Sequence, residues 1–163
     1  MSRVSRFGPV PLSDAEVMNG FLGGAEFVFT GPEHWNALGL GATAVFPVQW
    51  VYNRRLSGTF RLERRTYVLH CRRFPYPTQP VEWVVVDLFD NADAAGVASE
   101  TLVTSLRRSV RSGCFDPARL ILTAKEYGSP QTVQLICATC SKTADQSRPA
   151  IPTRGTRQHS ALA

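Results

Sequence analysis

The chain has 163 residues, of which 44% are hydrophobic and 19% charged, and it carries a formal net charge of +5 with a pI near 9.4. These values are typical of one folded, soluble domain with a single core. No apolar run reaches the ~18 residues that a membrane span needs, so we expect no transmembrane segment. All but two of the 18 basic residues are arginine, and an arginine-rich protein favours polyanionic partners.

The cysteines and the N-terminus indicate the compartment. The four cysteines are Cys71, Cys114, Cys137 and Cys140, and the first residues lack the charged-then-apolar layout of a secretory signal peptide. A disulfide framework is therefore not expected. We predict an intracellular reducing compartment, the cytoplasm or nucleus, in which any membrane contact is peripheral.

The first half of the chain predicts an arm, one helix and several strands. Residues 1–11 are short and irregular, which is typical of a flexible N-terminal arm. Ser13 and Glu16 form a capping box that starts a helix, and Gly23 ends it. Pro47 lacks a hydrogen-bond donor and so predicts an edge strand or a bulge. Four strands are expected, over residues 25–30, 43–52, 57–63 and 66–74.

The second half begins with an apolar run over residues 81–90, which predicts a buried strand in the middle of the sheet because it leaves no solvated face. Asp90 or Asn91 is expected to cap the following helix, which ends at Gly113 in the left-handed conformation. Alternating apolar residues then predict a final hairpin. Its two strands are expected over residues 119–126 and 131–138.

Short links between neighbouring strands predict antiparallel pairing. The predicted fold class is therefore α+β, with a single domain over residues 12–140. It is built as a twisted antiparallel sheet of about five to seven strands packed on two helices. Residues 141–163 contain no aromatic residue and four basic residues against one acidic residue. This composition predicts a disordered basic tail.

Seven arginines lie between positions 54 and 73, a stretch whose acidic residue is Glu63. In a hairpin they can share one outer face, where guanidinium groups beside tyrosine suit phosphate backbones or anionic head groups. The alternative is a solvated strand face that happens to use arginine. The predicted polyanion-binding residues are Arg54, Arg55, Arg61, Arg64, Arg65, Arg72, Arg73 and Tyr67. A secondary basic cluster is predicted at Arg107, Arg108 and Arg111, where a helix C-terminus also favours cations.

Cys137 and Cys140 have the spacing of half a zinc site. Such a site needs two more ligands, and the candidates are His70, Cys71 and Cys114, none of which forms a second cysteine pair. A lone pair of this kind is more typical of one buried and one exposed cysteine. We therefore expect no metal and no cofactor, and zinc is the alternative.

Catalytic motifs are missing from the sequence. It contains no nucleophile elbow, no phosphate-binding glycine loop and no paired-histidine metal motif. The histidines His34, His70 and His159 are scattered, and Glu82 and Asp87 lie in the apolar run, where structural carboxylates are expected. The sequence therefore predicts a protein that is not an enzyme.

Residues 82–117 combine Glu-Trp-Val-Val-Val-Asp-Leu-Phe with an alanine-rich helix, the run Ser-Leu-Arg-Arg-Ser-Val-Arg-Ser-Gly and Asp-Pro. This pattern resembles the corresponding segment of matrix proteins from non-segmented negative-strand RNA viruses, of the bornavirus and rhabdovirus type. The resemblance implies a small, basic protein of the virion that binds membrane and nucleocapsid and forms homo-oligomers. No functional residue is transferred from it.

Three functions follow from these observations. The first is a viral matrix-like structural protein that binds an acidic lipid surface, ribonucleoprotein, or both through a basic face, at a peripheral membrane and in the virion. The alternative is an RNA-binding protein, such as a viral suppressor of host defence, that uses the same face with tyrosines stacked on bases. The third is a small zinc-binding protein or enzyme built on Cys137 and Cys140.

Overall fold

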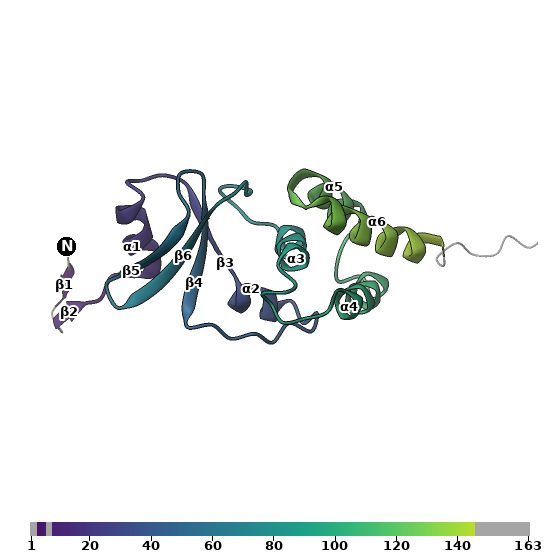
Figure 1. The fold of residues 1–163 in the computed structure, drawn as a ribbon, viewed down its shortest axis with the longest axis horizontal. Helices are drawn as coiled ribbons and strands as arrows, with labels where there is room; N and C mark the ends of the chain where they lie inside the picture. Colours follow the sequence, from purple (N-terminus) through teal and green to yellow (C-terminus); the bar gives the residue numbers. More distant parts are fainter. Residues whose placement is uncertain (1–2, 6–7, 146–163) are drawn as a thin grey trace, which may run out of the picture.

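A computed structural model describes residues 3–5 and 8–145. The fold is α+β, with one four-stranded mixed sheet and six helices in this part of the chain (Figure 1). The strands are β1 (Arg3–Ser5), β2 (Gly8–Val10), β3 (Phe27–Thr30), β4 (Val48–Asn53), β5 (Gly58–Leu62) and β6 (Arg65–Cys71). The helices are α1 (Asp14–Phe21), α2 (Pro32–Ala37), α3 (Val81–Asp90), α4 (Ser99–Arg111), α5 (Pro117–Tyr127) and α6 (Pro130–Asp145).

The main sheet has the strand order β3-β4-β6-β5. β3 pairs antiparallel with β4, and β5 pairs antiparallel with β6, but β4 and β6 are parallel. The predicted antiparallel sheet of five to seven strands is therefore wrong in both strand number and direction. β6 inserts between β4 and β5, so two strands that follow each other in the sequence are not neighbours in space.

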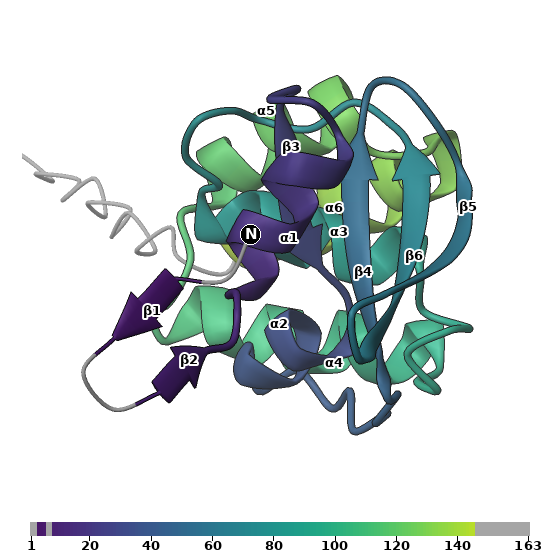
Figure 2. The same ribbon diagram turned by 90° about the vertical axis from the view of Figure 1, so that its left-hand side faces the viewer.

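Helices cover both faces of this sheet. α1 lies across one face, and α3 lies against the other, with α4, α5 and α6 forming a further layer behind it (Figures 1 and 2). Met18 and Leu22 of the α1 region pack on Val51, Tyr67 and Leu69 of the sheet. A larger apolar core contains buried side chains from every helix between α2 and α6. The two helices predicted from the sequence are therefore too few.

Several local predictions are confirmed. Ser13 caps α1, and its side chain and that of Glu16 form both hydrogen bonds of the capping box. The strand over residues 25–30 and the hairpin of β5 and β6 are present. Gly113 has φ of 80° and closes α4, where the Cys114 N–H donates to the Ser109 carbonyl at 2.9 Å. These features need only contacts between near neighbours in the sequence.

The apolar run over residues 81–90 is helix α3, so the predicted central strand is wrong. Seven of its residues are buried because α3 lies between the sheet and the other helices. A segment buried on nearly all sides shows no polar face from which its period can be read. Pro80 occupies the N-cap position and ends the extended segment that precedes the helix.

The predicted hairpin over residues 119–126 and 131–138 is also wrong, because these segments lie in helices α5 and α6. Leu120 and Ala124, four residues apart, are fully buried, whereas Leu122 between them is 67% exposed. This pattern follows a helical period and not strand alternation. The alternation seen in the sequence is produced by residues that lie on different sides of one helix.

Two other local predictions are wrong. α4 starts at Ser99 after a turn, so Asp90 and Asn91 do not cap it. β4 lies inside the sheet, and Pro47 precedes its first residue, so the predicted edge or bulge is wrong.

At the two ends of the chain, β1 and β2 pair within the predicted N-terminal arm, and α6 continues through Asp145 into the predicted tail. The rest of that tail, residues 146–163, lies outside the described residues.

Candidate nucleic-acid interface

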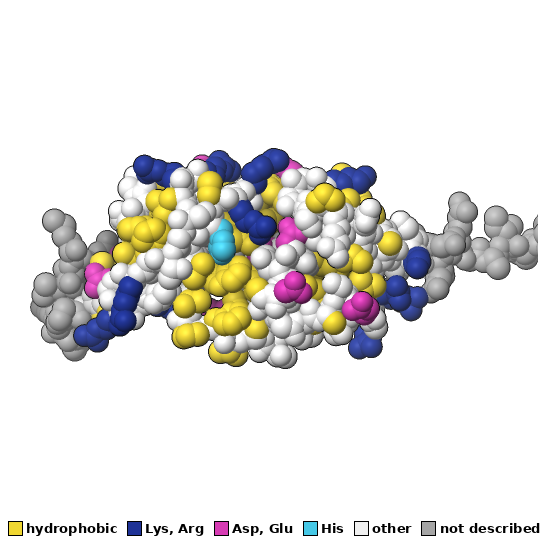
Figure 3. Space-filling model, viewed as in Figure 1, with side chains coloured by type: hydrophobic (Ala, Val, Ile, Leu, Met, Phe, Trp, Pro, Cys, Tyr) yellow, Lys and Arg dark blue, Asp and Glu magenta, His cyan; other side chains and the backbone are white. Residues whose placement is uncertain are grey.

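The parallel pairing of β4 with β6 gathers four arginines. Asn53 and Cys71 are partners in the ladder, so the residues that follow both strands emerge at the same end of the sheet. We call this group the arginine rim. It consists of Arg54, Arg55, Arg72 and Arg73. Figure 3 shows basic side chains along the corresponding upper edge of the molecule.

The other three predicted arginines lie at the opposite end of β6, around the β5–β6 turn. Arg65 begins β6 and Arg72 follows its last residue. At about 3.3 Å per residue, the length of this strand separates the two groups by about 20 Å. Arg61 and Arg64 lie with Arg65, and the single basic face predicted from the sequence is thus divided into two.

Several of these arginines already have partners. Arg54 pairs with Glu26 at 2.9 Å, and Arg65 pairs with Asp14. Arg55 donates to the Leu22 carbonyl at 2.9 Å. Both ion pairs are largely exposed, so they cost little to open and leave these cations available to a polyanion.

Tyr67 lies beside Arg64 and Arg65 in the lining of a second recess, of about 400 Å³, at the far end of the sheet from the arginine rim. It is 1% exposed, and its hydroxyl donates to Asp14 at 2.6 Å. Burial raises the pKa of Tyr67 to about 12. Its ring packs against the α1 region and offers almost no surface for stacking, and its role in polyanion binding stays a prediction.

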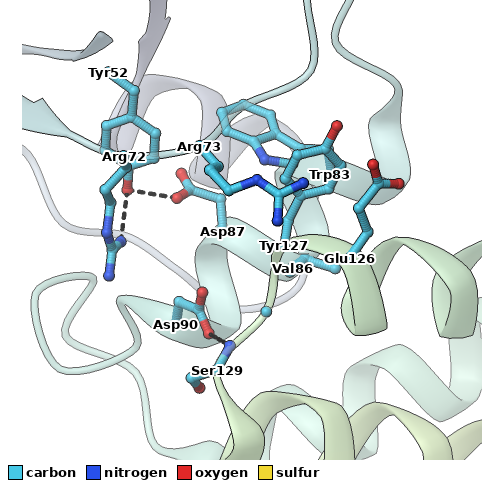
Figure 4. A pocket seen from close by; sticks show the side chains of 11 residues that line it. Tyr52, Arg72, Arg73, Trp83, Val86, Asp87, Asp90, Glu126, Tyr127 and Ser129 are labelled. Carbon is cyan, nitrogen blue, oxygen red and sulfur yellow. Dashed lines mark hydrogen bonds between the residues drawn. The ribbon is translucent and has the colours of Figure 1, made fainter. Parts of the chain in front are cut away.

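A recess of about 230 Å³ opens beside the arginine rim (Figure 4). It lies between the ends of β4 and β6, helix α3 and the turn that joins α5 to α6. Arg72 and Arg73 both line it, although consecutive residues of an extended strand point to opposite sides. The chain turns after β6, and this turn brings both guanidinium groups to one opening. The remaining lining residues are Tyr52, Trp83, Val86, Asp87, Asp90, Glu126, Tyr127, Gly128 and Ser129.

Aromatic rings form part of the recess wall. The guanidinium of Arg73 lies over the Tyr127 ring, 5.8 Å from its centroid, and that of Arg72 lies 5.6 Å from the Tyr52 centroid. Trp83 contacts Tyr52 edge-to-face, with the two ring centroids 6.0 Å apart. Trp83 and Tyr127 were not predicted as site residues, and no sequence signal could have found them, because they meet only where α3 packs on α5.

Asp87 lies beneath the recess as a buried structural carboxylate. It accepts hydrogen bonds from Thr30, from the Trp35 indole at 2.8 Å and from the Tyr52 hydroxyl at 2.6 Å. Asn91 donates to it as well, at 3.1 Å. Burial raises the pKa of Asp87 and that of Tyr52. The expectation of a satisfied carboxylate at this position is confirmed, and the network joins β3, β4, α2 and α3 at one point.

Neither His34 nor His70 hydrogen-bonds to Asp87 in the part of the chain that the structure describes. The ring of His70 contacts those of Trp50 and Tyr52, with ring centroids 4.8 and 5.8 Å apart. Its buried Nε2 has no hydrogen-bond partner among the described residues. Burial lowers the pKa of His70. His34 lies on α2 and His159 lies outside the described residues.

The secondary basic cluster lies close together on α4. Arg107, Arg108 and Arg111 line one recess together with Thr104. They follow Thr104 by three, four and seven residues, and positions with this spacing share one face of a helix. The Nε atom of Arg107 is buried and has no partner in the described part of the chain. The cluster belongs to α4, which lies in the outer helical layer, apart from the strands that carry the arginine rim (Figure 1).

Cys137 and Cys140 lie within helix α6 and not at the end of a strand. Cys140 is buried, which raises its pKa to about 11, and a neutral thiol is a poor metal ligand. Cys71 and Cys114 are free and exposed. Within residues 3–5 and 8–145, the structure brings no three His, Cys, Asp or Glu side chains together in a metal-binding arrangement.

Comparisons with other proteins do not assign the chain to a family. No known protein family, no curated protein and no solved structure matches it significantly. None of the helices in the described part of the chain is both long enough and apolar enough to span a bilayer.

Proposed function

We propose that the chain is a non-enzymatic RNA-binding domain that holds a single-stranded phosphate backbone at the arginine rim. The observation that carries the proposal is the parallel register of β4 and β6, which gathers four arginines at one end of the sheet, where Arg72 and Arg73 line a recess that Tyr127 also lines. Guanidinium groups bind phosphate through paired hydrogen bonds, and a partly exposed ring such as that of Tyr127 can stack on an unpaired base. This combination favours single-stranded nucleic acid over a featureless anionic surface.

The two separated arginine groups support RNA more than a membrane. A flat bilayer is best met by one continuous basic face, whereas the arginines here lie at opposite ends of β6. Carboxylates also stand among them, since Asp90 and Glu126 line the same recess. The matrix-like role implied by residues 82–117, with its acidic membrane partner and homo-oligomer, stays a prediction that the following experiment also tests.

The test measures binding of a fluorescent single-stranded RNA by anisotropy between 50 and 200 mM salt. The variant R54Q/R73Q removes two rim charges without touching the buried Asp87 network. We expect weaker binding and a salt slope smaller by about 1.4, since each phosphate contact on a single strand contributes about 0.7. The matched control, R61Q/R64Q, removes two exposed arginines from the far end of the sheet and should leave the slope nearly unchanged.

Flotation with liposomes that contain acidic lipid runs in parallel. Binding to these liposomes together with a failure to bind RNA would refute the proposal in favour of the matrix-like role. Equal weakening of RNA binding by both double variants would show that RNA is attracted by the overall positive charge of the protein. That result would refute the arginine rim as the binding site.

A further inference from the structure

We infer that the recess beside the arginine rim binds one unpaired guanine base. The inference rests on the proposed function and specifies which base the recess binds. The recess measures about 230 Å³, below the ~300–1,000 Å³ of pockets for drug-sized ligands. A space of this size suits one flat ring system, with the attached phosphates left outside at the rim.

Charge inside the recess argues against a phosphate as the enclosed group. Two guanidinium groups, Arg72 and Arg73, share the recess with three carboxyl groups, Asp87, Asp90 and Glu126. A phosphate placed among them would meet more carboxyl than guanidinium groups. An uncharged ring with hydrogen-bond acceptors on one edge and donors on another meets both kinds of group favourably.

The arrangement of these groups matches the edges of guanine. Figure 4 shows Arg72 and Glu126 on opposite sides of the recess, with Arg73 between them. Guanine presents its O6 and N7 acceptors to a guanidinium, and its N1–H and N2–H donors can reach a carboxylate through two parallel bonds. The N1–H and N2–H donors are free only in an unpaired base, which agrees with a single-stranded ligand.

Two polar groups of the recess are already held in place. Arg72 donates to the Tyr52 hydroxyl at 3.2 Å, so it is oriented before a ligand arrives. Asp90 accepts from the Ser129 N–H at 3.0 Å and forms part of the floor. Glu126 is exposed at the mouth of the recess, next to Tyr127, whose ring forms part of the wall. We therefore assign the carboxylate that receives the guanine donors to Glu126.

The experiment compares oligouridine RNAs that carry one central G, A, C or U, by anisotropy. We expect the G-containing RNA to bind about tenfold more tightly than the all-U RNA, since a good bidentate base contact discriminates by roughly this factor or more. Replacing G by inosine, which lacks the N2 amino group, should lose several-fold of that preference. E126Q should abolish the preference, so that this variant binds the G-containing and the all-U RNA with equal affinity.

The control variant is E100Q, which alters an exposed carboxylate in the first turn of α4 and should keep the preference for guanine. Thermal melts of both variants separate a loss of contact from a loss of folding. Binding of all four RNAs with equal affinity, or a preference for another base, would overturn the guanine assignment and leave the proposed function standing. A failure to bind any of the RNAs would refute the proposed function itself, and the assignment with it.

Discussion

At the residue scale, Asp87 shows how one buried carboxylate joins distant parts of the chain. Its hydrogen-bond donors come from the end of β3, from α2, from β4 and from the residue after α3. Because Tyr52 also accepts a hydrogen bond from Arg72, the same network orients one arginine of the rim. A structural group beneath the recess thus positions a residue of the proposed site.

Replacing Asp87 should therefore cost much stability. In D87A the donors from Thr30, Trp35 and Tyr52 stay buried without their acceptor, and we expect the free energy of unfolding to fall by about 3–5 kcal/mol. Urea denaturation measures this change. The exposed Asp93 offers a control, and D93A should change the unfolding free energy by less than about 0.5 kcal/mol. Similar effects of the two variants would contradict the network.

At the element scale, the strands predicted over residues 81–90, 119–126 and 131–138 are wrong, because all three segments lie in helices. α3 is buried on nearly all sides, so its sequence contains no polar face to reveal a helical period. In α5 the alternating apolar residues suggested a strand, although burial follows positions four residues apart. Tertiary packing, and not local preference, decided the structure of both segments.

Two leucines of α5 distinguish the helix from the predicted strand. Leu120 is fully buried and Leu122 is 67% exposed, whereas a strand would place both on one face. We expect L120A to lower the free energy of unfolding by about 2–5 kcal/mol and L122A to leave it within about 0.5 kcal/mol. Equal losses in chemical denaturation would favour the strand.

At the scale of the whole molecule, α3 is the element on which both halves of the fold depend. It packs on the sheet through Trp83 and on the helical layer through Val85 and Leu88. β5, by contrast, is an edge strand with half-exposed and exposed residues. The molecule therefore has its most protected element at the centre and its least protected strand at the edge.

Hydrogen–deuterium exchange measured by mass spectrometry should reflect this order. The amides of α3 are expected to exchange only through global unfolding, and those of β5 through local opening at lower free energy. Peptides that cover Val81–Asp90 should therefore remain protected longest. Earlier exchange in α3 than in β5 would contradict the central position of this helix.

The sequence alone was enough for the α+β class, the capped first helix, the β5–β6 hairpin and the glycine that ends α4, because each depends on residues near one another in the chain. It also showed that arginine dominates the basic residues. Only the tertiary structure decided that residues 81–90 are helical and that β4 pairs with β6. The reason is physical: burial on all sides removes the period that distinguishes helix from strand, and pairing between separated strands decides which arginines meet.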